Sequence, residues 1–141
     1  MDLEKLKQDL DKFREQVSDM EEDDLHLALA NLSALKEVLG GMPPSDVRNQ
    51  LGAEVDELIA LVKKTLEIRE YVKGLEQVRE QIPSMSKQDI QTLYRRLSSV
   101  REDLAVGVLE HEYYRPLLEA VEELIAYIET FIEEEDEDVL H

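Results

Sequence analysis

The residues best suited to chemistry in this chain are three histidines, and they do not form a site. Cysteine is absent, which excludes disulfides, thiolate catalysis and cysteine-ligated metals. Asp23 and His26 are three positions apart, a spacing that could place two ligands on one helix face, but a metal site needs several such pairs converging. His111 lies between two glutamates, and adjacent helical positions point about 100° apart. We therefore expect surface histidines.

Two short acidic motifs near the C-terminus suggest a second kind of chemistry. Glu119 with Glu122, and Glu133 with Asp136, resemble the carboxylate pairs that bind Mg²⁺ in all-α nucleotide pyrophosphatases. Such pairs must face each other from different helices, whereas both fall here on one predicted helix. A small Mg-dependent all-α hydrolase is thus only an alternative. We expect no enzyme activity and no catalytic, cofactor-binding or metal-binding residues.

The charge of the chain restricts its partners. Its 141 residues have a formal net charge of −18, and phosphate-binding glycine loops and basic-aromatic stripes are absent. Such a charge repels nucleic acids and anionic membranes, so we expect no direct contact with either. It favours a basic protein partner, although a solvated acidic coat is the alternative. The N-terminus lacks the pattern of a signal peptide, and no apolar run approaches the ~18 residues of a membrane span, so we expect a cytoplasmic protein.

Apolar residues recur at spacings of three and four, which predicts an all-α fold. Few glycines and prolines are present to make the turns of a β-rich fold. Gly40 and Gly41 end one expected helix, Ser45 caps the next, and Pro116 fits the first turn of the last. The first three stripes are Leu3, Leu6, Leu10, Phe13 and Val17; Leu25, Leu29, Leu32, Leu35 and Leu39; and Val47, Leu51, Val55, Leu58, Val62 and Leu66.

The pattern then repeats at a shift of about 65 positions. The segment FREQV at 13–17 returns as VREQI at 78–82, and VDELIA at 55–60 returns as VEELIA at 121–126 with one inserted residue. Polar positions match as well as apolar ones, so helical periodicity alone does not explain the likeness. We interpret the chain as a tandem duplication of a three-helix unit of roughly 65 residues, with five to six helices in all.

The boundary between the two copies has no break signal. Residues 63–73 hold no Pro, Gly or Asn, which predicts a long shared helix from about 45 to 81 joining the two halves. The expected division is a first repeat at 1–66, a second at 67–135 and an acidic tail at 136–141. One compact helical domain is the alternative.

Differences between the copies indicate where a partner could bind. The first copy has an additional stripe of Leu27, Ala30, Ala34 and Val38, where the second has Thr92, Arg95, Ser99 and Asp103. Burial on both sides of that helix is one interpretation, and an exposed groove or dimer face is the other. The second copy alone has an expected loop from Gly107 to Arg115, and its residues Tyr113, Tyr114 and Arg115 are either interface anchors or a seal over the bundle end. The acidic run that includes Glu133, Glu134, Glu135 and Asp136 could steer a basic partner.

These features together favour a non-enzymatic acidic helical module for protein–protein interaction. A basic protein is the expected partner, in an inhibitor, antitoxin or immunity, nucleic-acid-mimic or chaperone-like role. The alternatives are a self-associating structural protein, with a homodimer closing over the Leu27–Val38 stripe, and the Mg-dependent hydrolase.

Overall fold

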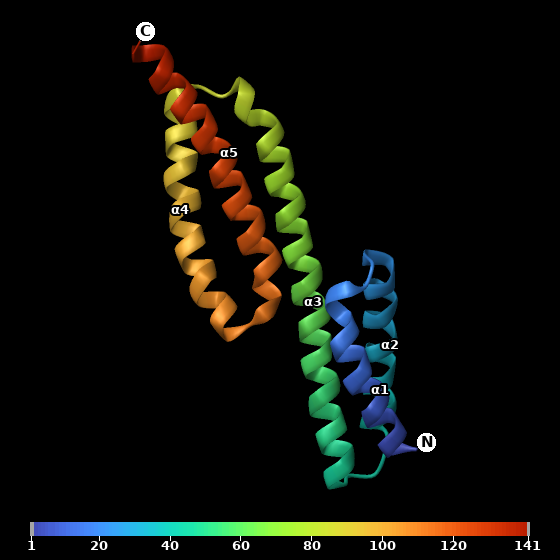
Figure 1. Ribbon diagram of the computed structural model, residues 1–141. Coiled ribbons are helices and arrows are strands. Elements are labelled where there is room, and N and C mark those ends of the chain that lie inside the picture. The colour runs from blue at the N-terminus through green and yellow to red at the C-terminus, as the bar shows by residue number, and fades with distance from the viewer. Residues whose placement is uncertain (1, 141) are drawn as a thin grey trace. The chain divides into compact units, whose positions relative to one another are not determined.

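The computed structural model describes the backbone of residues 2–140 and the side chains of residues 2–132. Within that range it is all-helical and contains no strand, which confirms the predicted all-α class (Figure 1). Three short 3₁₀ segments, η1 (Val17–Asp19), η2 (Ile82–Ser84) and η3 (Glu112–Tyr114), accompany the helices. The five helices are α1 (Leu3–Gln16), α2 (Glu22–Gly40), α3 (Asp46–Gln81), α4 (Lys87–Glu110) and α5 (Arg115–Leu140).

The chain divides into two compact units between Glu67 and Ile68. This division falls inside α3, so that one uninterrupted helix supplies residues 46–67 to the first unit and 68–81 to the second. The long helix expected from about residue 45 to 81 is thus observed. No helix-breaking residue interrupts α3 near the division. Gly74 lies inside this helix and is tolerated there at a modest cost.

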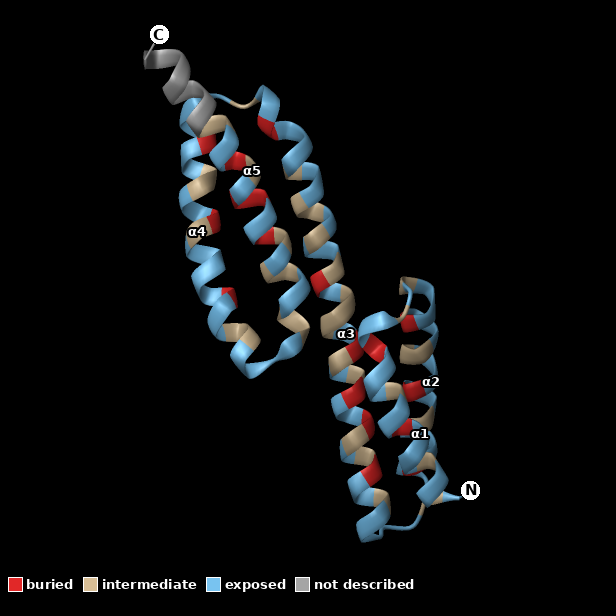
Figure 2. Cartoon of the chain, viewed as in Figure 1, coloured by how far each residue is buried: buried red, intermediate tan, exposed pale blue. Residues whose placement is uncertain are grey.

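The first unit packs α1, α2 and the start of α3 side by side around an aliphatic core (Figures 1 and 2). The buried positions follow the helical periods seen in the sequence, because residues three and four apart share one face of a helix. Partly buried Phe13 and Met20 pack at the edge of this core. Its buried members are Leu10, Val17, Leu25, Leu32, Leu39, Leu51, Val55, Leu58 and Val62.

Polar contacts hold the helices of the first unit in register. The Ser45 hydroxyl accepts from the Arg48 backbone N–H at 3.1 Å, as expected for the cap of α3. The Arg48 guanidinium donates to the Leu39 carbonyl at 3.0 Å, which satisfies an acceptor in the last turn of α2. Lys36 of α2 pairs with Asp56 of α3 at 2.8 Å. The short connection between α2 and α3 is therefore tied to both helices.

The second unit packs the end of α3 with α4 and α5 around its own core. The Ser86 side chain accepts from the Asp89 backbone N–H at 3.2 Å and caps α4. The Arg79 guanidinium of α3 lies 4.5 Å from the ring centroid of Tyr127 on α5, a cation–π contact between two helices of this unit. The buried members of the core are Ile82, Ile90, Leu97, Leu104, Val121, Leu124, Ile125 and Ile128.

The connection between α4 and α5 differs from the expected one. The sequence placed a loop from Gly107 to Arg115, whereas α4 continues to Glu110 and η3 follows almost at once. The expectation was wrong because Gly107 does not end the helix. Its missing side chain instead makes room for Tyr114, since a Cβ at this position would lie 3.2 Å from Cδ2 of that ring.

Candidate functional site

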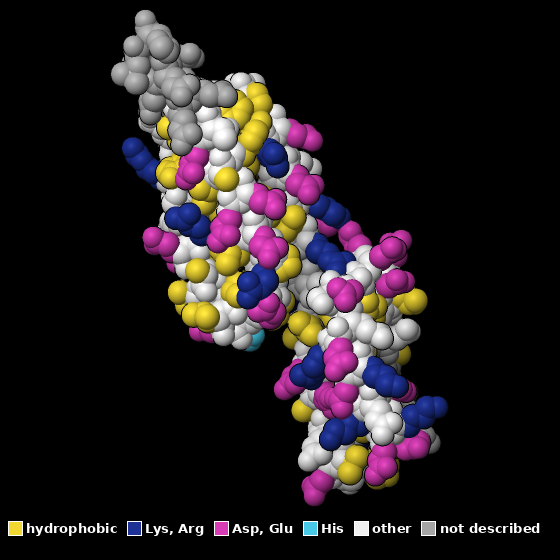
Figure 3. All heavy atoms as spheres, in the orientation of Figure 1, with side chains coloured by type: hydrophobic (Ala, Val, Ile, Leu, Met, Phe, Trp, Pro, Cys, Tyr) yellow, Lys and Arg dark blue, Asp and Glu magenta, His cyan; other side chains and the backbone are white. Residues whose placement is uncertain are grey.

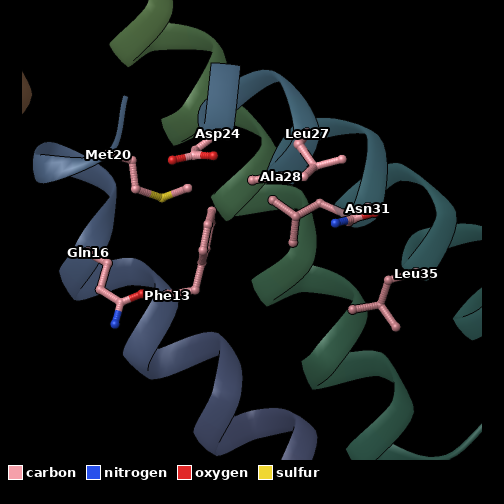
Figure 4. Close-up of a pocket in the computed structure, with 9 residues that line it drawn as sticks. Phe13, Gln16, Met20, Asp24, Leu27, Ala28, Asn31 and Leu35 are labelled. Atoms are coloured by element: carbon pink, nitrogen blue, oxygen red, sulfur yellow. The ribbon is translucent and has the colours of Figure 1, made fainter. Parts of the chain in front are cut away.

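The first unit has a groove of about 480 Å³ between α1, the turn that follows it, and α2 (Figure 4). Phe13 and Met20 lie on its α1 side, and Leu27 and Leu35 lie on its α2 side. Neutral polar side chains are present at Gln16 and Asn31. The lining is completed by Asp24, Ala28 and Leu32.

The outer face of α2 carries an apolar strip that adjoins this groove at Leu27. Because α2 turns its Leu25, Leu32 and Leu39 stripe into the core, the residues about half a turn away face outward. Leu27, Ala30, Ala34 and Val38 are all exposed, with Leu27 at 61% and Val38 at 49%. Of the two sequence interpretations, the structure thus favours an exposed face, and α1 buries none of these four side chains.

Acidic side chains border one end of the strip. Glu21, Asp23 and Asp24 are exposed at the start of α2, one turn before Leu27. Acids in the first turn of a helix also interact favourably with its dipole, so the same residues stabilise α2. His26 lies 4.0 Å from Glu22 and is a surface residue, as expected. Figure 3 shows Asp and Glu side chains interleaved with exposed apolar ones over the visible face of both units.

The tyrosines of the second unit form a small aromatic cluster. Tyr113 stacks on His111 with ring centroids 4.8 Å apart and an interplanar angle of 13°. Tyr114 lies 4.8 Å from Tyr113 and packs against the core beside Gly107. Tyr114 therefore seals the end of this unit, which is the second of the two roles considered for it. Both tyrosines remain partly exposed.

Arg115 is exposed and pairs with a neighbour at the start of α5. Its guanidinium donates to both carboxylate oxygens of Glu112, at 3.3 Å for the Nη2–Oε2 pair. This pairing lowers the pKa of Glu112 and raises the pKa of Arg115. Both charges are thus retained at neutral pH, and Arg115 contributes to the local structure of the loop.

The acidic residues Glu133, Glu134, Glu135 and Asp136 lie outside the residues whose side chains are described. Among the described side chains, no group of three or more His, Asp or Glu is placed to hold a metal ion. Over residues 2–140, none of the helices combines the length and the apolar character that crossing a bilayer requires.

An exposed apolar surface near the end of α4 was missed in the sequence. Val106 is 60% exposed and Leu109 is 87% exposed, both close to the His111–Tyr113 stack along the chain. The available signal was the unbroken apolar run from Ala105 to Leu109, which continues past the core position Leu104. Five consecutive residues of a helix point to every side of it, so some of these apolar side chains had to be exposed.

In comparisons with family models, curated proteins and solved structures, nothing matches the chain.

Proposed function

We propose that this chain is a cytoplasmic, non-enzymatic interaction module whose acidic helical surface binds a basic protein. The main support is the combination on α2 of an exposed apolar strip with an acidic run at its start. The apolar strip provides area to bury, and the net charge of −18 increases the rate at which a basic partner is encountered. Inhibition, immunity, nucleic-acid mimicry and chaperoning would all use such a surface.

We also propose that the two units are copies of one three-helix unit. Equivalent structural features recur 65 positions apart, including the 3₁₀ segments at 17–19 and 82–84 and the first residues of α2 and α4. Met20 and Met85 each donate a backbone N–H to the residue three positions earlier, Val17 and Ile82. Core residues recur at the same shift, or at one residue more in the last helix. On this view the α2 strip is an addition to a shared scaffold.

Affinity capture tests the proposal on binding. Wild-type chain and Leu27→Gln are immobilised and exposed to native lysate at low and high salt, and retained proteins are identified by mass spectrometry. Leu109→Gln is the matched control, since it removes an even more exposed leucine from the other unit. We expect wild type and Leu109→Gln to retain an excess of basic proteins at low salt, and Leu27→Gln to lose them. Retention with no bias toward basic proteins would contradict the proposal.

Self-association is the second candidate function, because Ala30 and Ala34 between Leu27 and Val38 would allow two helices to approach closely. The like charge of two copies opposes it. Light scattering of wild type and Ala34→Glu separates the possibilities. A dimer that Ala34→Glu dissociates would support this function, and a monomer in both samples would rule it out.

A further inference from the structure

The exposed apolar surface of the first unit is elongated along α2. Leu27 and Val38 are eleven residues apart, which corresponds to about 16 Å at the rise of an α-helix. Between them the exposed positions follow spacings of three and four, the spacing of anchor residues in helix-in-groove recognition. A small molecule in the groove beside Phe13 would leave Ala30, Ala34 and Val38 uncovered, because these residues do not line it. The length and direction instead match about three turns of a helix.

The shape of the surface allows a helix to lie close. Ala30 and Ala34 have short side chains at the middle of the strip, so a partner backbone can approach α2 closely there. Next to them, the groove between Phe13 and Leu27 offers about 480 Å³ for the apolar side chains of a partner (Figure 4). Met20 lies at the groove and is an unbranched side chain that adapts to different shapes.

The charges along the strip are unequal. Asp23 and Asp24 precede Leu27 by four and three positions, and Asp24 is itself part of the groove lining. Toward Val38 only Glu37 adds an exposed carboxylate. Cations also lie at that end, because Lys36 pairs with Asp56 at 2.8 Å and the Arg48 guanidinium donates to the Leu39 carbonyl at 3.0 Å. Positive charge on an occupant is therefore favoured most at the end beside Asp24, and the remaining length favours apolar contact.

From these observations we infer that the α1–α2 groove and the Leu27–Val38 strip bind one amphipathic helix of a partner, with Lys or Arg concentrated at the end beside Asp24. The inference rests on the proposed function and assigns the binding surface and the chemistry of the partner. A small apolar ligand and a second copy of the chain are the competing occupants.

A model peptide tests the inference directly. The probe is a fluorescein-labelled peptide of about 18 residues built from Leu, Ala, Gln and Lys, with Leu at helical spacing and all Lys in the first two turns. One control peptide has Glu in place of Lys, and another has the same composition in scrambled order. Fluorescence anisotropy at low salt measures the affinity of each for the full chain. We expect binding of the amphipathic Lys peptide alone.

Variants then assign the binding to the groove. Leu27→Gln should weaken the binding of the Lys peptide by about tenfold, the effect of losing one buried leucine contact. Asp24→Asn should weaken it by about threefold and reduce its salt dependence. Leu109→Gln and Asp89→Asn are the matched controls and should leave the affinity for the peptide unchanged. Asp89 has the same first-turn position in α4 that Asp24 has in α2. Circular dichroism checks that all variants remain folded, as expected for exposed positions.

Other results overturn the inference in distinguishable ways. Equal weakening by the Leu27 and Leu109 variants, or equal binding of the scrambled peptide, would show non-specific adhesion. No peptide binding, combined with Leu27-dependent binding of a small apolar dye, would assign the groove to a small ligand. No peptide binding, combined with a dimer lost in Ala34→Glu, would assign the strip to a second copy. If the peptide does not bind but basic proteins are still captured through Leu27, the proposed function stands and only the helical occupant is wrong.

Discussion

Glu54 on α3 shares a hydrogen bond with the carboxyl group of Asp11 on α1, which brings two acids together between helices of the first unit. Burial raises the pKa of Glu54 most, and the hydrogen bond and negative charge of Asp11 raise it further. Lys7 and Arg14 of α1 act in the opposite direction. This contact is therefore most favourable when one proton is shared.

The first prediction is that Glu54→Gln stabilises the protein at neutral pH and removes part of its pH dependence. The folded state holds the Glu54 proton to a higher pH than the unfolded chain does. The stabilisation is therefore complete below the ordinary pKa of glutamate and is lost as the pH rises through the raised pKa. Urea denaturation should give Glu54→Gln about 0.5 kcal/mol more stability than wild type at pH 7 and little difference in acid.

Glu57→Gln is the matched control for this prediction, because Glu57 is on the same helix but pairs with Arg14 at 3.2 Å. Its loss should leave stability at neutral pH unchanged or slightly lower. A stability gain equal to that of Glu54→Gln would mean that general charge reduction, and not the carboxyl pair, is responsible.

Only some residues of the candidate site could be predicted from the sequence. The comparison of the two copies drew attention to Leu27 and Val38 but left burial and exposure as alternatives, and the exposure of both residues is seen only in the structure. Phe13 was expected only in the apolar stripe of the first helix and Met20 had no expected role, yet both pack against the core and line the groove. They sit at the seam between two helices, where one side chain contacts the core with one edge and the groove with the other. Helical periodicity predicts which way a side chain points, but it does not predict how wide the space between two helices is.

At the scale of the elements, caps and apolar periods predicted five to six helices and the continuous α3, and the described residues form five. The missed feature was the extension of α4 through Gly107, a residue that local propensity treats as a helix end. Gly107 instead packs against the ring of Tyr114. Tyr114 lies seven positions further along the chain, in η3 and beyond the end of α4. A sequence pattern does not contain that contact.

The second prediction compares two helical glycines. Gly74→Ala in α3 should raise the free energy of unfolding by about 0.5–1 kcal/mol, because nothing lies within 4 Å of the added Cβ and alanine restricts the unfolded chain. Gly107→Ala should gain less or lose stability, since its Cβ would lie 3.2 Å from the Tyr114 ring. Thermal unfolding measures both.

A double substitution separates propensity from the ring contact. In a Tyr114→Ala background, Gly107→Ala should show the same gain as Gly74→Ala, because the obstructing ring is gone. If Gly107→Ala stabilises the wild-type protein as much as Gly74→Ala does, the close approach of Tyr114 does not constrain this glycine.

At the scale of the whole molecule, the two units have separate cores while sharing one helix. No residue belongs to both of the buried clusters among the described residues. Each core is small, because domains of about 60 residues bury a lower fraction of their surface than larger ones. The sequence predicted both halves from periodicity but could not predict whether a defect in one core would be transmitted along α3 to the other.

The third prediction concerns that transmission. Ile128→Ala should remove a completely buried side chain and cost the second unit about 2–5 kcal/mol, and Val62→Ala should weaken the first unit in the same way at a smaller cost. Amide hydrogen exchange should then accelerate in α4 and α5 for Ile128→Ala and in α1 and α2 for Val62→Ala. The reason is that each defect empties only its own core, while α3 can fray from the weakened end and keep its contacts at the other. Equal acceleration in both units by either variant would show that α3 couples them into one cooperative structure, and the binding surface on α2 would then depend on the stability of the second unit.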